Sequence, residues 1–208
     1  MCIPWDYETP NGTHRLVLQP IISQLIIEME NGTIDLPSAA SDTRPFHERI
    51  FQSLTPPGSA YFAGHYRGEP YPNLMYYNVQ FGGRTGVYCT DVPQVMENLR
   101  QVLEQWFPML EILSQYQDPT IFLFNLIEYA ADAFFRFTTI HPYANGNGHI
   151  GRFIVWAFLL RFRFRPINWT IDPRPYTPSD IYIQAILAYG FGNKRPLIDL
   201  ILNSIGTP

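Results

Sequence analysis

The segment with the clearest chemical potential runs from His141 to Arg152 and reads HPYANGNGHIGR. Apolar runs flank it, one from Ile121 to Phe137 and the other from Phe153 to Leu160. A glycine-rich turn that opens into a helix leaves unpaired backbone N–H groups directed at one point, and such groups bind phosphate. A histidine just before the turn can move a proton beside that phosphate. The segment therefore predicts phosphoryl or nucleotidyl transfer.

The predicted phosphate-binding turn consists of Gly146, Asn147 and Gly148. Glycines permit a positive φ and a close approach of the backbone to a ligand, and successive N–H groups form a concave anion nest. The helix that follows adds a partial positive charge at the same place. His149 and Arg152 share one face of this helix, and an arginine there can bind a phosphate bidentately.

His141 is the predicted general base. Pro142 favours an extended backbone for the residue before it, so we expect the imidazole to face across the turn. A free imidazole titrates near about 6.5 and can accept a proton from an attacking hydroxyl at neutral pH. Asn145 is the predicted metal ligand, because an amide oxygen can bind magnesium, although an asparagine also suits a turn without a metal.

The spacing of apolar residues predicts a mostly helical domain around this segment. One helix is expected to start at Asp118-Pro119 and to end near Ile140, and another to run from about His149 to Arg161. The second is apolar on all sides, which is typical of a helix buried in the middle of a bundle. Further helices are expected over residues 20–30, 43–54, 91–106, 179–189 and 197–205.

The stretch from residue 59 to residue 90 differs, because glycine, proline and tyrosine dominate it. Residues 74–81 favour a strand, and residues 85–89, after Gly82-Gly83, are expected to form the return arm of a hairpin. Residues 1–14 are expected to be an irregular arm, since prolines and an Asn-Gly pair interrupt any period.

Composition excludes several classes of protein. Of the 208 residues, 46% are hydrophobic and 15% are charged, which does not suit a disordered chain. The net charge of -4 does not favour a general nucleic-acid binder. The two cysteines form no disulfide framework, and no signal peptide or membrane-spanning run is evident. We therefore expect a cytoplasmic protein with no nucleic-acid partner and no membrane partner.

The central segment resembles the signature of Fic-domain (Fic/Doc) proteins, His-Pro-Phe-x-(Asp/Glu)-Gly-Asn-Gly-Arg-x-x-Arg. The matching residues are His141, Pro142, Gly146, Asn147, Gly148 and Arg152, with Tyr143 in place of the phenylalanine. Other segments also resemble the family, namely residues 46–51, residues 64–67, Tyr182 and Arg195-Pro196. The resemblance covers about residues 45–205.

This resemblance implies an all-α, Fic-type helical bundle with a small β-hairpin flap that docks an extended segment of a target protein. It divides the chain into an N-terminal arm and helix over residues 1–44 and a Fic domain over residues 45–208. Most members transfer AMP from ATP to a hydroxyl of a target protein, with magnesium. The resemblance implies that His141 is the base. It implies that the turn 146–148 binds the α- and β-phosphates and that Arg152 binds the terminal phosphate. It also places His149 and Tyr182 in the nucleotide site.

Two departures from the family pattern leave the function open. Asn145 stands where the family has an acidic metal ligand, and His149 stands where it has the first arginine, for which a neutral imidazole is a weak substitute. The chain is therefore either a nucleotidyltransferase, whose donor is ATP, another nucleoside triphosphate or a different phosphate ester, or a silenced Fic domain that binds a nucleotide or a partner.

Two further hypotheses come from single residues. A metal nuclease is weakly suggested by His141, Asn147 and His149, but the flanking helices and the acidic net charge argue against it. Members of the family also often meet an inhibitory Ser/Thr-x-x-x-Glu-Gly/Asn helix. Glu30-Asn31 matches the end of this pattern, but Ile26 occupies the place of the Ser/Thr. Autoinhibition is therefore not assigned, and a block of Arg152 by Glu30 is a hypothesis.

Overall fold

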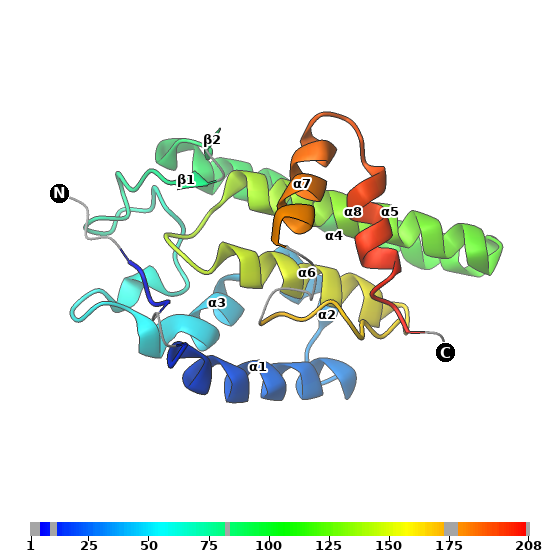
Figure 1. The fold of residues 1–208 in the computed structure, drawn as a ribbon, viewed down its shortest axis with the longest axis horizontal. Coiled ribbons are helices and arrows are strands. Elements are labelled where there is room, and N and C mark those ends of the chain that lie inside the picture. Colours follow the sequence, from blue (N-terminus) through cyan, green and yellow to red (C-terminus); the bar gives the residue numbers. More distant parts are fainter. Residues whose placement is uncertain (1–4, 9–11, 82–83, 173–178, 207–208) are drawn as a thin grey trace.

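Helices α5 (Pro119–Ile140) and α6 (Asn147–Arg161) lie side by side at the centre of the molecule and are joined by a short loop (Figure 1). The computed structural model describes residues 5–8, 12–81, 84–172 and 179–206. Residues 149–159 of α6 are all buried, which confirms that the helix that is apolar on all sides is central. Gly151 lets α5 approach closely, because a Cβ there would lie 3.0 Å from the ring of Phe134.

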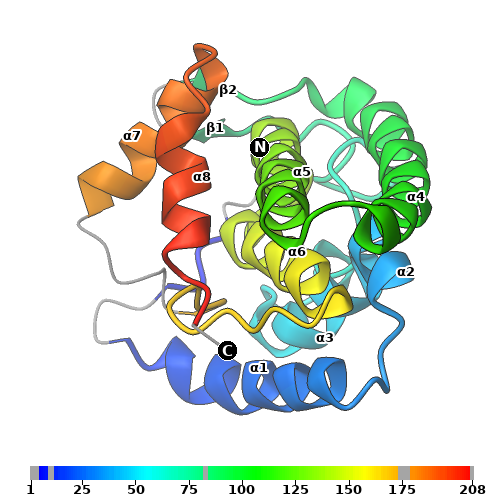
Figure 2. The same cartoon turned by 90° about the vertical axis from the view of Figure 1, so that its right-hand side faces the viewer.

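The remaining helices surround this pair (Figure 2). Helix α4 (Val92–Tyr116) packs along α5, and α2 (Leu36–Ser41) packs on α6 and α4. Helix α1 (His14–Glu30) covers α3 (Arg44–Phe51) and contacts α6, while α8 (Arg195–Leu202) packs on α5 and on α7 (Ser179–Gly190). Single 3₁₀ turns are η1 (Gln52–Leu54), η2 (Ala60–Phe62) and η3 (Cys89–Asp91).

The expected helices are present, with shifted ends, and the all-α fold class is confirmed. Asp118 caps α5 by accepting hydrogen bonds from the backbone N–H groups of Thr120 and Ile121, as a residue at this position should. Helix α1 begins at His14, six residues before the expected start at residue 20. Helix α2 was not expected, because six residues give too short a period to recognise.

The strands are much shorter than predicted. Strand β1 (Gln80–Phe81) pairs antiparallel with β2 (Arg84–Thr85), whereas residues 74–79 form turns and irregular backbone. Residues 74–79 contain neither proline nor glycine, but Pro70 and Pro72 precede them and Gly82-Gly83 follows, and residues of these two types interrupt strands. A pair of two-residue strands does not support the expected hairpin flap.

A single hydrophobic cluster connects the N-terminal arm with the helices. Trp5 and Tyr7, from the arm, belong to the same buried cluster as the apolar residues of α1, α5 and α6. Among the described residues, none of the helices combines the length and the apolar character needed to cross a membrane.

Candidate functional site

The loop between α5 and α6 places His141 in a left-handed turn. Its φ of 54° and ψ of 59° differ from the extended backbone that Pro142 led us to expect. The N–H group of His141 donates to the carbonyl of Phe137 at 3.0 Å, so the residue closes the helix as its C-cap. A residue before proline must avoid the right-handed helical region, and the left-handed conformation satisfies this restriction as well.

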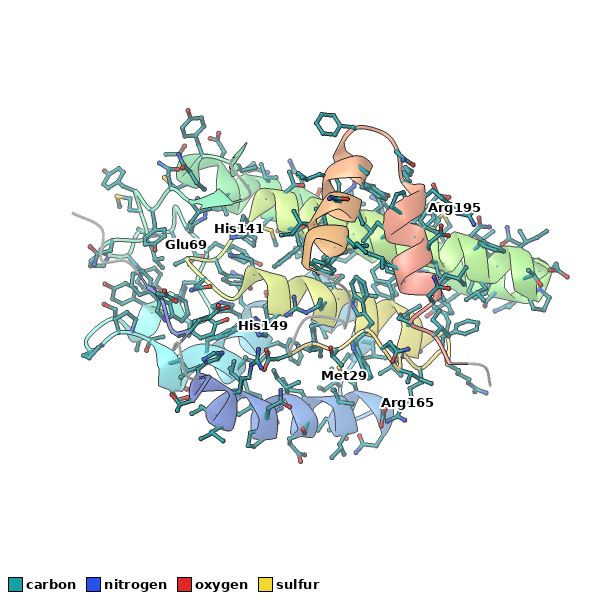
Figure 3. All side chains as sticks on the ribbon, in the orientation of Figure 1. Met29, Glu69, His141, His149, Arg165 and Arg195 are labelled. Atoms are coloured by element: carbon teal, nitrogen blue, oxygen red, sulfur yellow. The ribbon has the colours of Figure 1, made fainter. Side chains whose placement is uncertain are left out.

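The imidazole of His141 lies partly buried at this turn, beside the loop that leads to α6 (Figure 3). Its Nδ1 lies 3.3 Å from the carbonyl oxygen of Thr138, so a protonated Nδ1 donates there and Nε2 has the lone pair. Burial lowers the pKa of His141 to about 4; the Thr138 carbonyl opposes this shift and the charge of Arg67 adds to it. The imidazole is therefore neutral, and able to accept a proton, at pH 7.

The loop is held in shape by two buried side chains. The amide of Asn147 accepts from the N–H group of Tyr143 at 2.8 Å and donates to its carbonyl at 2.9 Å. His47 accepts at Nδ1 from the N–H group of Gly64 and donates from Nε2 to the carbonyl of Asn145, both at 3.0 Å. Its ring also stacks on the ring of Tyr143, with 3.7 Å between the centroids. Asn147 can thus contribute its backbone to phosphate binding, while its side chain maintains the turn.

The beginning of α6 presents donors without protein partners. Gly146 has a φ of 77°, and a Cβ on this residue would lie 2.5 Å from the ring of Phe51, so only glycine fits. In the part of the chain that the structure describes, the backbone N–H groups of Asn147 and Gly148 donate to no protein acceptor. Unpaired N–H groups at a helix N-terminus form a site for an anion.

Arg152 lies beside these N–H groups with a buried charge. The residue is only 3% exposed, and its Nε and Nη2 donate to the carbonyl of Ile171 at 2.9 and 2.6 Å. Its Nη1 lies 3.1 Å from the place that a Cβ of Gly148 would occupy. Within residues 5–8, 12–81, 84–172 and 179–206, no carboxylate forms an ion pair with Arg152. A buried cation without a carboxylate is costly, and an anion bound here would offset that cost.

His149 is engaged at both ring nitrogens. Its Nδ1 lies 3.3 Å from the hydroxyl of Tyr7, and its Nε2 lies 3.1 Å from Oδ1 of Asp172. Gln19, from α1, holds the same carboxylate with a hydrogen bond of 3.0 Å. Burial lowers the pKa of His149, while the Asp172 carboxylate opposes the shift. The ring is thus neutral and bonded within the protein, and phosphate binding by His149 stays a prediction.

Asn145 joins the motif to the N-terminal arm. Its Nδ2 donates to the carbonyl of Trp5 at 2.8 Å, and its Oδ1 accepts from the N–H group of Gly146 at 2.7 Å. Nowhere among the described residues do three or more His, Cys, Asp or Glu side chains gather in a way that could hold a metal ion. Both polar atoms of the Asn145 amide are thus bonded within the protein, and the metal role of Asn145 stays a prediction.

The prediction that Glu30 blocks Arg152 is wrong. The Oε1 of Glu30 accepts from Nε of Arg165 at 2.6 Å, and the two residues form an ion pair. Arg165 follows the C-terminal end of α6, whereas His149 lies in the first turn of this helix, which spans roughly 20 Å (Figure 3). Glu30 ends α1 near Arg165, and therefore lies far from the beginning of α6 where Arg152 meets the turn.

Tyr182 lies in the core between helices. Its ring in α7 is 5% exposed and packs near the rings of Phe134 and Trp169, with centroid distances of 6.2 and 6.0 Å. A role for Tyr182 in nucleotide binding stays a prediction.

Four residues that support the motif were not identified as such from the sequence. Tyr7 and Asp172 bind His149, His47 holds the loop, and Arg67 binds the carbonyls at the end of α5. Most of them lie far from the motif in the sequence, and contacts of this kind leave no periodic signal. For His47 and Arg67 the available signal was their place in the segments that resemble the Fic family.

Comparisons with known proteins identify the family and the fold of this chain. The model of the Fic/DOC family matches residues 38–159. One similar structure is BepC, a VirB-translocated effector protein from Bartonella tribocorum with bound AMPPNP, with a TM-score of 0.66 and 15% identity over 96% of this chain and 89% of that chain. Another is the N-terminal Fic domain of a putative cell filamentation protein from Bartonella quintana with bound ADP, with a TM-score of 0.58 and 16% identity over 96% and 89%.

The N-terminal FIC domain of Bep8 from Bartonella sp. 1-1C is also similar, with a TM-score of 0.64 and 14% identity over 95% of this chain and 87% of that chain. No curated protein sequence matches the chain. At identities this low, the structural likeness shows the fold alone. The family model, however, covers more than half of the sequence and includes the whole motif. The chain belongs to the Fic/DOC family.

Proposed function

We propose that this protein is a Fic-type nucleotidyltransferase, which transfers AMP or another nucleoside monophosphate from a nucleoside triphosphate to a hydroxyl side chain of a target protein. The observation that supports this most is the buried guanidinium of Arg152, which has no carboxylate partner among the described residues and lies beside the unpaired N–H groups of Asn147 and Gly148. A buried cation and a helix N-terminus together favour a polyanion such as a nucleotide.

The reaction follows from the two sides of the loop. The target hydroxyl gives its proton to Nε2 of His141 while its oxygen attacks the α-phosphorus. The bond from that phosphorus to the bridging oxygen breaks in line, and pyrophosphate leaves. The N–H groups at the start of α6 and Arg152 bind the phosphates and stabilise the charge that develops on them. Positioning and charge stabilisation supply most of the rate enhancement in such transfers.

One further point supports the proposal. BepC and the Bartonella quintana protein have a bound nucleotide or nucleotide analogue in their structures, and their fold is the same. The docking of an extended segment of the target protein at β1 and β2 stays a prediction, because each of these strands has only two residues.

A silenced Fic domain is the second candidate, because of the bonding around two motif residues. The amide of Asn145 is bonded to Trp5 and Gly146, and the ring of His149 is bonded to Tyr7 and Asp172. If these contacts persist with a nucleotide bound, the protein binds the nucleotide and does not turn it over.

Calorimetry with ATP, GTP, UTP and CTP, with and without magnesium, tests the binding step. Arg152→Met is the variant, and Arg161→Met is a matched control, since it removes another arginine of α6 that is exposed and paired with Glu111. We expect a nucleotide to bind to the wild-type protein and to the control, and to bind much less tightly to Arg152→Met. The proposal is overturned if none of the four nucleotides binds to the wild-type protein.

Transfer is then tested with the nucleotide that binds, labelled at the α-phosphate, in the wild-type protein and in His141→Ala. We expect labelled protein with the wild type only, and equal nucleotide binding by both. Binding by both proteins without labelled product would favour the silenced domain.

A further inference from the structure

Arg67 is fully buried, and its guanidinium binds only backbone carbonyls among the described residues. Its Nε donates to the carbonyl of His141 at 2.8 Å, and its Nη1 donates to that of Tyr77 at 2.9 Å. Its Nη2 donates to the carbonyls of Val87 and Ile140, both at 3.1 Å. The planar fork of an arginine can reach four acceptors in fixed directions, which an ammonium group on a flexible stem cannot do.

Three of the bonds from this residue hold the end of α5. Besides the two bonds to Ile140 and His141, the backbone N–H group of Arg67 donates to the carbonyl of Pro142 at 2.8 Å. Carbonyls in the last turn of a helix lack partners within the helix and form the negative end of its dipole, so they favour a cation. Arg67 thus grips three consecutive carbonyls, and the residue in the middle is the proposed base.

The other two bonds reach the segments on either side of the strands. Tyr77 lies before β1, and Val87 lies after β2. The fit is tight here, since a Cβ on Gly68 would lie 1.7 Å from the carbonyl oxygen of Cys89. One side chain therefore links the proposed base to both ends of the segment that contains β1 and β2.

The capping of the C-terminal end of α5 does not by itself require a buried arginine. A glycine or a surface lysine can satisfy the end of a helix without burial of a charge, and burial of an unpaired charge costs free energy. The arrangement is better explained by a need to hold three separate backbone segments in one fixed relation.

We propose that Arg67 is a positioning residue, which holds the backbone of His141 in its left-handed turn and in register with the segments that contain β1 and β2. The effect of Arg67 on catalysis rests on the proposed function, whereas the positioning of His141 rests on the hydrogen bonds of Arg67. The charge of Arg67 also contributes to the lowered pKa of His141.

The test compares Arg67→Met, which keeps the length of the side chain, with Arg67→Lys, which keeps the charge and loses the fork. Leu126→Ala, a buried position in the middle of α5, is the control for lost stability. Arg161→Met is the control for the removal of an arginine. Each protein is measured for kcat and KM of the transfer, for the pKa of His141 by NMR titration, and for amide exchange.

We expect kcat of Arg67→Met to fall by about 10- to 100-fold, since a displacement of the order of 1 Å is sufficient for such a loss. The KM for the nucleotide should stay within about twofold, because Arg67 does not contact the proposed phosphate site. The pKa of His141 should rise, and amide exchange should accelerate both at 138–141 and at 84–88. For Arg67→Lys we expect a smaller fall in kcat and little change in the pKa of His141.

The inference is overturned if Arg67→Lys and Arg67→Met match Leu126→Ala in kcat, in the pKa of His141 and in exchange at both segments. If Arg67→Met does not fold, Arg67→Lys decides the question by kcat and exchange. If the wild-type protein transfers no nucleotide, the proposed function fails, while the NMR titration and the exchange data still decide whether Arg67 positions His141.

Discussion

At the scale of single residues, burial determines what the two motif histidines can do. His141 and His149 both have lowered pKa values because burial disfavours the imidazolium form. The ring of His141 lies at the turn, where neutrality keeps it able to accept a proton. The ring of His149 is bonded to Tyr7 and Asp172, so neutrality there removes the positive charge that an arginine would supply to the phosphates. The same physical effect thus keeps the proposed base unprotonated, although it lowers the proton affinity of the ring, and it removes positive charge from the proposed anion site.

The pH dependence of kcat should report the lowered pKa of His141. The folded-state pKa is about 4, so the base is lost only when the pH falls to that value, and kcat should be flat from pH 6 to pH 8. A histidine of ordinary pKa would lose half of its activity near about pH 6.5. The measurement is kcat at saturating nucleotide across this range. A midpoint near 6.5 would contradict the assignment of His141 in its buried position as the base.

His47 should make the stability of the protein depend on pH. Burial lowers its pKa to about 3, while the unfolded chain has the ordinary value near about 6.5, so the unfolded state binds more protons below that pH. Its stability contribution is therefore complete above about pH 6.5 and is lost progressively as the pH falls toward 3. Between pH 7.5 and 5.0 this amounts to roughly 2 kcal/mol.

Urea unfolding of the wild type and of His47→Gln at pH 7.5 and pH 5.0 isolates the contribution of His47 to the change in stability, since the other histidines titrate in both proteins. The wild type should lose more stability than the variant on going to pH 5.0. Equal losses would mean that His47 is not buried as a neutral ring against Tyr143.

At the scale of elements, periodicity predicted the helices well and the strands poorly. Helices α5 and α6 have long apolar patterns, and α6 contains almost nothing that could face water, so its central place followed from the sequence. The turn between them was predicted from its glycines. Strands β1 and β2 are set by a few hydrogen bonds in a stretch rich in turn-forming residues, where aromatic content alone misleads.

The contacts that complete the site were not predictable, for a physical reason. Tyr7 reaches His149 across 142 positions, and Arg67 reaches His141 across 74, and neither contact follows from local propensity. Such contacts depend on how helices and loops pack in three dimensions. The motif thus predicted which residues do chemistry, while the residues that hold them in place became visible only in the folded chain.

Gly146 should be the most sensitive position at the beginning of α6. In Gly146→Ala the residue must adopt a positive φ, and its Cβ must also enter the ring of Phe51 at 2.5 Å. Gly32→Ala is a matched control, because Gly32 has a φ of 76° and nothing within 4 Å of the added carbon. We expect the control to lose about 1 kcal/mol from backbone strain, and Gly146→Ala to lose a further 1–3 kcal/mol from overpacking.

Urea unfolding of both variants measures this difference, and calorimetry shows its effect on the site. Nucleotide binding should weaken in Gly146→Ala and stay unchanged in Gly32→Ala. Equal stabilities of the two variants would show that Phe51 can move aside without cost, and that the turn is less constrained than its geometry indicates.

At the scale of the whole molecule, Trp5 and Tyr7 of the N-terminal arm pack against the Fic domain. The ring of Trp5 stacks on Phe62 at 5.7 Å between centroids, its Nε1 donates to the carbonyl of Leu54 at 2.9 Å, and its own carbonyl accepts from Asn145. Tyr7 packs on Phe51 and binds His149. These contacts connect Trp5 and Tyr7 to the motif itself, so we propose that the two predicted parts of the chain form one cooperative unit.

Substitutions in the arm should therefore lower the stability of the entire protein. Trp5→Ala removes a large ring that is only 4% exposed, and we expect a loss of about 3–5 kcal/mol in the free energy of unfolding. Tyr7→Phe removes one hydroxyl and keeps the ring, so the loss should be about 1 kcal/mol. Urea unfolding followed by tryptophan fluorescence and by circular dichroism should give one coincident transition in both variants, because a single cluster spans the arm and the central helices. The proposal of one cooperative unit is contradicted by two separate transitions, or by a Trp5→Ala variant as stable as the wild type. Either result would show that the arm packs on the surface of an independent domain and does not stabilise the position of Asn145.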